Sequence, residues 1–273
     1  MKIAFRLSAK ERLPLGMVAI TIVFILVISC QKIVQIDLNS SSPKLVIEGV
    51  ITDSAGPFRV MLTKSGSYFN QPVLPPVSGA FITISDNAGI IDTLKELMPG
   101  IYFTSKIKGM PGQSYSLKVI SENTEYDAST SMMSHVNIDS LVVEKSVGLG
   151  GKENRRLTCY FNDPRAEKNY YRLKMYTNGK TSAENYHLYD DQYTDGETIG
   201  MRSGGAQIGD TDVVVLESID KKAYDYYRTL EDIIRTNPFF GSTPANPNSN
   251  LSNGALGYFA AFTVSNKAFI VSR

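Results

Sequence analysis

Apolar and polar residues alternate along most of the chain after residue 44, in short runs that Gly, Pro, Asn and Asp interrupt. A period of two puts successive side chains on opposite faces of a strand, and turns at this spacing are typical of β-sandwiches. No regular exchange of strands with helices accompanies the pattern, which argues against a parallel α/β sheet. The alternation predicts strands at residues 45–52, 58–64, 80–85, 90–94, 101–104, 115–121, 126–132, 138–141, 156–162, 170–176, 184–189, 197–201, 213–218, 256–263 and 267–271.

One segment follows the 3.6-residue period of a helix instead. Its apolar side chains recur after Asp220 and stop before Pro238, at Ala223, Tyr226, Tyr227, Leu230, Ile233 and Ile234. Aspartate is a favoured N-cap and proline ends a helix, so we predict a helix over residues 220–236 whose tyrosine stripe is a packing face. The predicted fold is mainly all-β, with two tandem β-sandwich units (immunoglobulin-like or fibronectin-III-like) at residues 44–135 and 136–273 and the helix inserted in the second.

Two connections are too long for tight turns. Residues 66–79 are rich in proline, which cannot donate to a strand ladder, so an exposed loop is expected there. Residues 237–253 form a longer connection, and loops of this length are binding elements, lids or disordered linkers. The apolar Phe239 and Phe240 favour an ordered loop, anchored by their rings, over a disordered linker. We predict partner contact on the crest of this loop, at Thr243, Asn246, Asn248 and Asn250.

The first 29 residues have the order of an export signal, with basic side chains at the start and an apolar run at about residues 15–28. The run ends in LVISC at residues 26–30, which resembles a bacterial lipobox. We expect cleavage between Ser29 and Cys30, acylation of Cys30, and a polar tether at residues 30–43. The alternative is an uncleaved membrane anchor, but the uncharged run is at the short edge of the roughly 17–25 residues that a spanning helix needs.

The anchor sets the expected location and partners. Gln31 follows Cys30, and the absence of Asp there resembles lipoproteins passed to the outer membrane, on its periplasmic face or at the cell surface. The whole chain has a net charge of +1, but the expected signal is basic, so the mature chain is slightly acidic. Its charges are interspersed, whereas binding to nucleic acid needs a clustered positive face. We expect the membrane as a partner, no nucleic acid and no cofactor.

The chain lacks the short motifs of serine hydrolases, zinc proteases, P-loop proteins and zinc knuckles. Cys159 lies in an alternating run and is expected to be a buried core thiol. His135 and His187 have no catalytic partner near them in the sequence, so structural or exposed roles are favoured over a catalytic one. No catalytic residue is assigned, although the fold could still bring distant carboxylates together in a hydrolase site.

Two weaker candidate sites are an acidic cluster that could bind calcium and a serine that could accept a glycan. Asp190, Asp191 and Asp195 could offer oxygens to calcium, but the Asp-Gly pair that begins at residue 195 is a strong hairpin signal, and a turn is favoured over a metal site. Ser54, in the tripeptide DSA at residues 53–55, fits the short pattern of O-glycan acceptors in exported Bacteroidota proteins. A predicted turn would expose its hydroxyl.

Several motifs together resemble one family. They are LVIEG at residues 45–49, SGA at 78–80, PGIY at 99–102, GMPGQSYSL at 109–117, IDSL at 138–141, NPF at 237–239 and SNGALGYF at 252–259. In this order, and with the lipobox, they are similar to the Bacteroidota lipoproteins catalogued as domain of unknown function 4249. The resemblance covers nearly the whole mature chain. It implies a cell-envelope lipoprotein, often encoded beside TonB-dependent outer-membrane receptors, with no established activity and no catalytic residues.

These observations favour a non-enzymatic binding or accessory role. The expected partner is a TonB-dependent receptor, in the uptake or sensing of an external molecule, and the ligand is left open between a small molecule and a glycan. Two alternatives are an envelope hydrolase that acts on glycan or peptide, and a structural or assembly lipoprotein.

Overall fold

Strands dominate the structure, a computed structural model that describes residues 42–66, 74–147, 153–181, 187–235 and 246–272. The strands of the first half are β1 (Leu45–Thr52), β2 (Arg59–Lys64), β3 (Phe81–Asp86), β4 (Ile91–Thr93), β5 (Lys95–Met98), β6 (Ile101–Phe103), β7 (Ser114–Ser121) and β8 (Thr124–Ser131). The second half contains β9 (Ser140–Val147), β10 (Glu153–Asn162), β11 (Tyr170–Thr177), β12 (Lys180–Thr181), β13 (His187–Asp190), β14 (Thr198–Gly205), β15 (Thr211–Ile219), helix α2 (Lys221–Arg235) and β16 (Leu256–Ile270).

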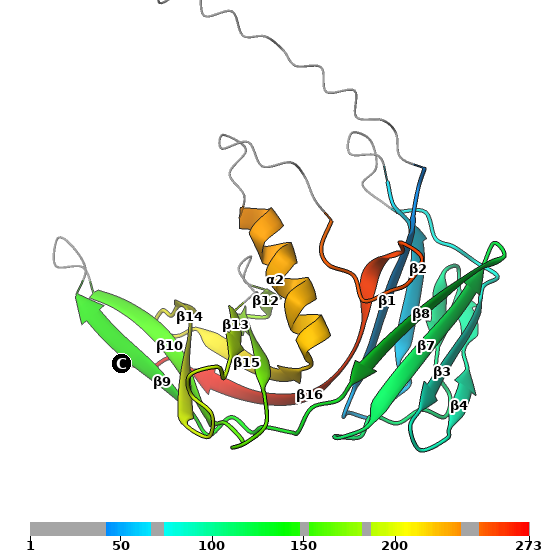
Figure 1. Cartoon of the computed structure of the whole chain (residues 1–273). Helices are drawn as coiled ribbons and strands as arrows, with labels where there is room; N and C mark the ends of the chain where they lie inside the picture. The colour runs from blue at the N-terminus through cyan, green and yellow to red at the C-terminus, as the bar shows by residue number, and fades with distance from the viewer. Residues whose placement is uncertain (1–41, 67–73, 148–152, 182–186, 236–245, 273) are drawn as a thin grey trace, which may run out of the picture. The chain divides into compact units, whose positions relative to one another are not determined.

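The strands of the described residues form three sheets (Figure 1). One has nine strands in the order β12-β11-β15-β16-β1-β2-β6-β5, with β13 also paired to β11. The others have the orders β4-β3-β7-β8 and β14-β10-β9. The β5 and β12 strands were not predicted, because the side chains of β5 do not alternate between buried and exposed positions and β12 has only two residues.

The first sandwich packs one end of the nine-stranded sheet against the four-stranded sheet. In β1 the odd-numbered side chains are buried and the even-numbered ones are partly exposed, as the sequence alternation predicts. Ile47 and Ile51 from this strand share a core cluster with Ile84 of β3 and Leu117 of β7. Because each sheet contributes one apolar face, the predicted sandwich architecture is confirmed in this half.

The second sandwich packs the other end of the nine-stranded sheet against β14, β10 and β9. Leu157 and Phe161 of β10 lie in one cluster with Leu173 of β11 and Leu216 of β15. The predicted mainly β, sandwich-like fold is therefore present in both halves of the described chain.

Strand β16 runs through both sandwiches. It pairs in parallel with β1 from Leu256 to Phe262, and antiparallel with β15 from Thr263 to Ile270. Its side chains Phe259 and Ala261 belong to the core of the first sandwich. Two strands were predicted here, at residues 256–263 and 267–271, and this was wrong. The polar residues between them pair with β15 and continue the strand instead of forming a turn.

The other two sheets pack on one face of the nine-stranded sheet, and helix α2 covers the other face (Figure 1). The predicted cap is confirmed, since the Asp220 carboxylate accepts a hydrogen bond from the N–H of Ala223 at 2.8 Å. Asp220 also accepts from the hydroxyl of Thr130 at 2.9 Å, and that hydroxyl accepts from the N–H of Ala261 at 3.0 Å. The predicted tyrosine packing face is confirmed, because Tyr226 and Tyr227 are buried against the sheet.

Several predictions lie outside the described residues. These are the signal at residues 1–29, the tether up to residue 41, and Ser29, Cys30, Phe239, Phe240 and Thr243. Within the described part of the chain, no helix combines the length and the apolar character needed to cross a bilayer.

Candidate functional site

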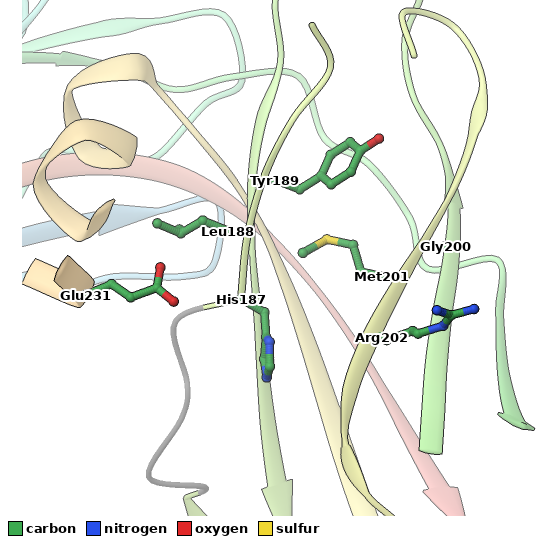
Figure 2. Close-up of a pocket in the computed structure, with 7 residues that line it drawn as sticks. All are labelled: His187, Leu188, Tyr189, Gly200, Met201, Arg202 and Glu231. Atoms are coloured by element: carbon green, nitrogen blue, oxygen red, sulfur yellow. The ribbon is translucent and has the colours of Figure 1, made fainter. Parts of the chain in front are cut away.

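A hollow of about 380 Å³ lies where α2 meets the strands β13 and β14 (Figure 2). Its lining residues are His187, Leu188, Tyr189, Gly200, Met201, Arg202 and Glu231. The mixture of an aromatic ring, aliphatic side chains and a few polar groups is typical of small binding sites. Because Leu188 and Met201 bring apolar surface to an open, polar rim, the hollow can bind part of a ligand without enclosing it.

The charged groups of this hollow are paired with residues outside it. The Nε atom of Arg202 lies 3.3 Å from a carboxylate oxygen of Glu144, and Glu231 lies 2.8 Å from a guanidinium nitrogen of Arg235. Figure 2 shows the imidazole of His187 turned away from the Glu231 carboxylate. Of the described residues that line the hollow, Glu231 carries the one carboxylate. Among the described lining residues, the hollow thus has no second carboxylate facing Glu231, an arrangement that glycoside hydrolysis by paired carboxylates uses.

The predicted acidic cluster is only partly assembled. Asp191 and Asp195 come together with Asp163, and one carboxylate oxygen from each lies within 4.8 Å of the others. Asp190 is not part of this group. Its carboxylate accepts hydrogen bonds from the hydroxyl of Tyr224 at 3.0 Å and from the N–H of Gln192 at 3.2 Å.

Each carboxylate of the trio already accepts a hydrogen bond from the protein. Asp163 accepts from the Tyr171 hydroxyl and the Gly196 N–H, Asp191 from the Asn169 N–H, and Asp195 from the Ala166 N–H. Burial, together with the hydrogen bond to Asp163, raises the pKa of Tyr171 far above its ordinary value. Three oxygens are also few for Ca²⁺, which takes six to eight. The trio could give a cation a partial shell. The predicted turn is present at residues 192–196, and the hydrogen bonds of the trio tie it to residues 163–171.

A charged group lies buried beneath α2. Arg172 of β11 donates from Nε to the Glu217 carboxylate of β15 at 2.6 Å, and Lys174 also contacts that carboxylate. The guanidinium carbon of Arg172 lies 3.7 Å from the centre of the Tyr227 ring. Burial opposes the charge on Arg172, but Glu217 together with Tyr227 and Tyr258 outweighs burial and raises the pKa of Arg172. This group is closed off by the helix, so it holds α2 on the sheet.

The loop that follows α2 is ordered where it is described. Leu251 is buried in the core of the first sandwich, and the Ser252 N–H donates to the Asp127 carbonyl of β8 at 2.8 Å. The predicted contact residue Asn250 is engaged internally: its amide donates to the Phe259 carbonyl at 2.6 Å, and its side-chain oxygen accepts from the Phe259 N–H at 3.0 Å. Asn246 and Asn248 are exposed and stay candidates for partner contact.

The remaining candidate residues have clear positions. Ser54 is exposed, with its hydroxyl 2.6 Å from that of Thr52, so it stays a candidate glycan acceptor. His135 contacts the Asp53 carboxylate at 2.6 Å, where β1 ends. Cys159 is 1% exposed, and burial raises the pKa of its thiol to about 12, which confirms the predicted core position.

The sequence motifs that suggested a family occupy turns and strand contacts. The Glu96 carboxylate joins SGA to PGIY, accepting from the N–H groups of Gly79 and Gly100, both at 2.9 Å. These donors lower the pKa of Glu96 to about 2. In SNGALGYF, Gly257 has φ +92°, and a Cβ there would lie 2.1 Å from the Ile47 carbonyl oxygen of LVIEG. The absence of a side chain at Gly257 therefore lets β16 approach β1 closely.

The model of one family, described as "Domain of unknown function (DUF4249)", matches residues 31–268. The chain belongs to this family. The match confirms the resemblance to this family drawn from the motifs, and it extends over residues 31–268. None of the curated proteins compared with this DUF4249 member matches it.

Sequence reasoning missed three charged residues that the structure places in these sites. Asp163 joins the acidic trio from the end of β10, and Arg202 and Glu231 line the hollow from β14 and α2. The only available signal for Asp163 was its position directly after a predicted strand. Arg202 and Glu231 follow ordinary surface patterns, so nothing in the sequence distinguishes them.

Proposed function

We propose that this DUF4249 member is a non-enzymatic lipoprotein of the outer membrane, anchored through Cys30, that binds an external molecule as an accessory to a TonB-dependent receptor. The anchor rests on the lipobox at residues 26–30. The binding role is supported chiefly by the open hollow between α2, β13 and β14, whose described lining has apolar side chains and one carboxylate that is already paired. Such a lining suits contact with a ligand or partner better than hydrolysis.

The anchor can be tested by metabolic labelling with an alkynyl fatty acid. The wild-type chain should carry the label, and Cys30→Ser should lose it, because the acylated thiol is gone. Cys159→Ser is the matched control, since its thiol is buried in the core and should leave labelling unchanged. Label that survives Cys30→Ser would contradict the proposed anchor.

The binding role can be tested by photo-crosslinking in native membranes. A crosslinking residue at Arg202, whose side chain is 67% exposed at the hollow, should capture a receptor-sized outer-membrane partner. The same residue at Lys108, exposed on the first sandwich, is the control. Capture at neither position, in a chain that is anchored, would favour a structural or assembly role. Cleavage of glycan or peptide by the purified chain would favour the hydrolase.

A further inference from the structure

Five large apolar side chains are exposed at one end of the first sandwich. They are Leu74 (42% exposed), Phe81 (51%), Leu97 (66%), Met98 (51%) and Ile120 (38%), and they are called the tether-proximal patch below. Single exposed apolar residues are ordinary on a protein surface, but a group of them marks a contact surface.

Hydrogen bonds and strand register place this patch beside residue 44, where the expected tether ends and β1 is about to begin. At the start of β1, the N–H of Ser65 donates to the Lys44 carbonyl at 2.8 Å, so β2 ends beside the first described residues. Lys64 forms an ion pair with Glu122 in the β7–β8 turn, with Nζ and the carboxylate oxygen 2.7 Å apart. Ile120 lies two residues before that turn. In Figure 1, β1 begins and the β7–β8 hairpin turns at the same end of the sandwich.

The other members of the patch are tied to this end as well. Phe81 lies directly opposite Ile120 in the pairing of β3 with β7. The Glu96 carboxylate holds the N–H of Gly79, which leads into β3, and the N–H of Gly100, which follows Met98. Leu97 and Met98 are therefore fixed beside the start of β3. Leu74 precedes Pro75, whose carbonyl accepts from the N–H of Lys64 at 2.9 Å.

We propose that the tether-proximal patch rests on the lipid surface and inserts its apolar side chains at the boundary of headgroups and acyl chains. This inference rests on the proposed acylation of Cys30. It adds an orientation: the hollow between α2, β13 and β14 belongs to the second sandwich, so it is left free for a ligand or receptor while the first sandwich faces the bilayer.

The position of the patch, close to the expected anchor, favours lipid as its binding partner. An acylated Cys30 would bring the bilayer within reach of residue 44, since residues 30–43 span on the order of 40 Å even when extended. A tethered contact is intramolecular and gains a high effective concentration, so a few apolar side chains suffice. Exposed Lys44 and Lys95 flank the patch and can meet headgroup phosphates.

Tryptophan fluorescence can locate the patch at the membrane, because the chain has no natural tryptophan. The lipidated chain with Leu97→Trp is reconstituted into vesicles of phosphatidylethanolamine and phosphatidylglycerol, with or without bromine on the acyl chains. Bromine quenches only fluorophores that reach the acyl region, so the emission of Leu97→Trp should shift to the blue and be quenched. Ile208→Trp, at an exposed apolar position of the second sandwich (47% exposed), is the matched control and should be several-fold less quenched.

A second variant tests whether the patch acts as a unit. Phe81→Trp should be quenched like Leu97→Trp, and adding Leu97→Ser with Met98→Ser should reduce that quenching. These positions are exposed, so the changes should leave folding intact.

The outcomes separate the contact from the anchor. A chain that floats with the vesicles, but whose Leu97→Trp is quenched no more than Ile208→Trp, keeps the anchor and overturns the membrane contact. A blue shift that depends on protein concentration and not on brominated lipid overturns it in favour of a second copy of the chain. Failure of the Leu97→Trp chain with Cys30 intact to float overturns the anchor, and with it the inference.

Discussion

The two halves of this DUF4249 member bury charge in different ways. In the first sandwich, the Asp92 side chain is fully buried, and its carboxylate accepts from the N–H groups of Ser105, Lys106 and Ile107 and from the Ser105 hydroxyl. Burial alone would raise the pKa of Asp92, but these donors outweigh it and lower the pKa below its ordinary value. All the donors lie within 15 residues of Asp92 along the chain.

Beneath α2, the partners come from much farther away. Arg172 and Glu217 are separated by 45 residues, and Tyr227, whose ring covers the guanidinium, belongs to the helix. The carboxylate of Asp92 is satisfied by one nearby loop, whereas the charges of the second half are satisfied only when two strands and a helix have docked. Loss of one partner should therefore cost more in the second half, where the Glu217 carboxylate stays buried with Lys174 as its remaining cationic partner.

The largest effect is expected from Arg172→Met. The change leaves the Glu217 carboxylate, which is 2% exposed, with Lys174 as its remaining cationic partner, and it should lower the free energy of unfolding by about 3 kcal/mol. Urea denaturation followed by circular dichroism measures this. The double variant Arg172→Met with Glu217→Leu removes both charges and should recover much of the loss. A double variant as unstable as the sum of its single variants would contradict the pairing.

Asp92→Asn should have a smaller effect, a loss of about 2–3 kcal/mol, because an amide can accept at one oxygen only and presents its own N–H groups to the donors. Asp127→Asn, at an exposed position, is the control and should change stability by less than about 0.5 kcal/mol.

The pH dependence gives an independent test at Asp92. Because its folded pKa is lowered, its stabilising contribution is present above the unfolded pKa of about 3.9 and is lost as pH falls through the folded value. The difference between wild type and Asp92→Asn should therefore be constant near neutral pH and shrink below about pH 4. A difference that does not vary over this range would mean that the ionised carboxylate is not what the donors stabilise.

Asp220→Ala tests the contact between the halves. It removes the cap of α2 together with the bonds to Thr130 and Ser131 of β8, and it should cost about 1–2 kcal/mol. Asp220→Asn keeps an oxygen for the cap but loses an acceptor for β8, so it should fall between wild type and Asp220→Ala. Equal stability of Asp220→Asn and wild type would show that the bonds to β8 contribute nothing.

The smallest effect is expected on local opening of the second half, and the reactivity of the Cys159 thiol can report it. In a Cys30→Ser background Cys159 is the single thiol, and burial with a raised pKa should keep it unreactive toward a maleimide in the folded chain. Arg172→Met should speed labelling in urea well below the unfolding midpoint, because it loosens the second half first. Asp92→Asn, compared at a urea concentration that gives equal global stability, should label more slowly. Equal labelling rates would mean that the halves open as one unit.

Local chemistry in the sequence predicted much of the fold. Period-two alternation located most strands, and Asp220 with the following apolar spacing located α2, because these signals depend on neighbours within a few residues. The alternation around Cys159 was enough to predict its burial.

Tertiary structure decided what depends on distant residues. Ser265 and Asn266 resemble a turn, yet they lie inside β16 because β15 pairs with them. Asp163 joins Asp191 and Asp195 only through the fold, and Arg172 can be buried only because Glu217 and Tyr227 arrive from other elements. Each chain segment carries its own periodicity, but the partner that satisfies a buried polar group or extends a strand is a property of packing.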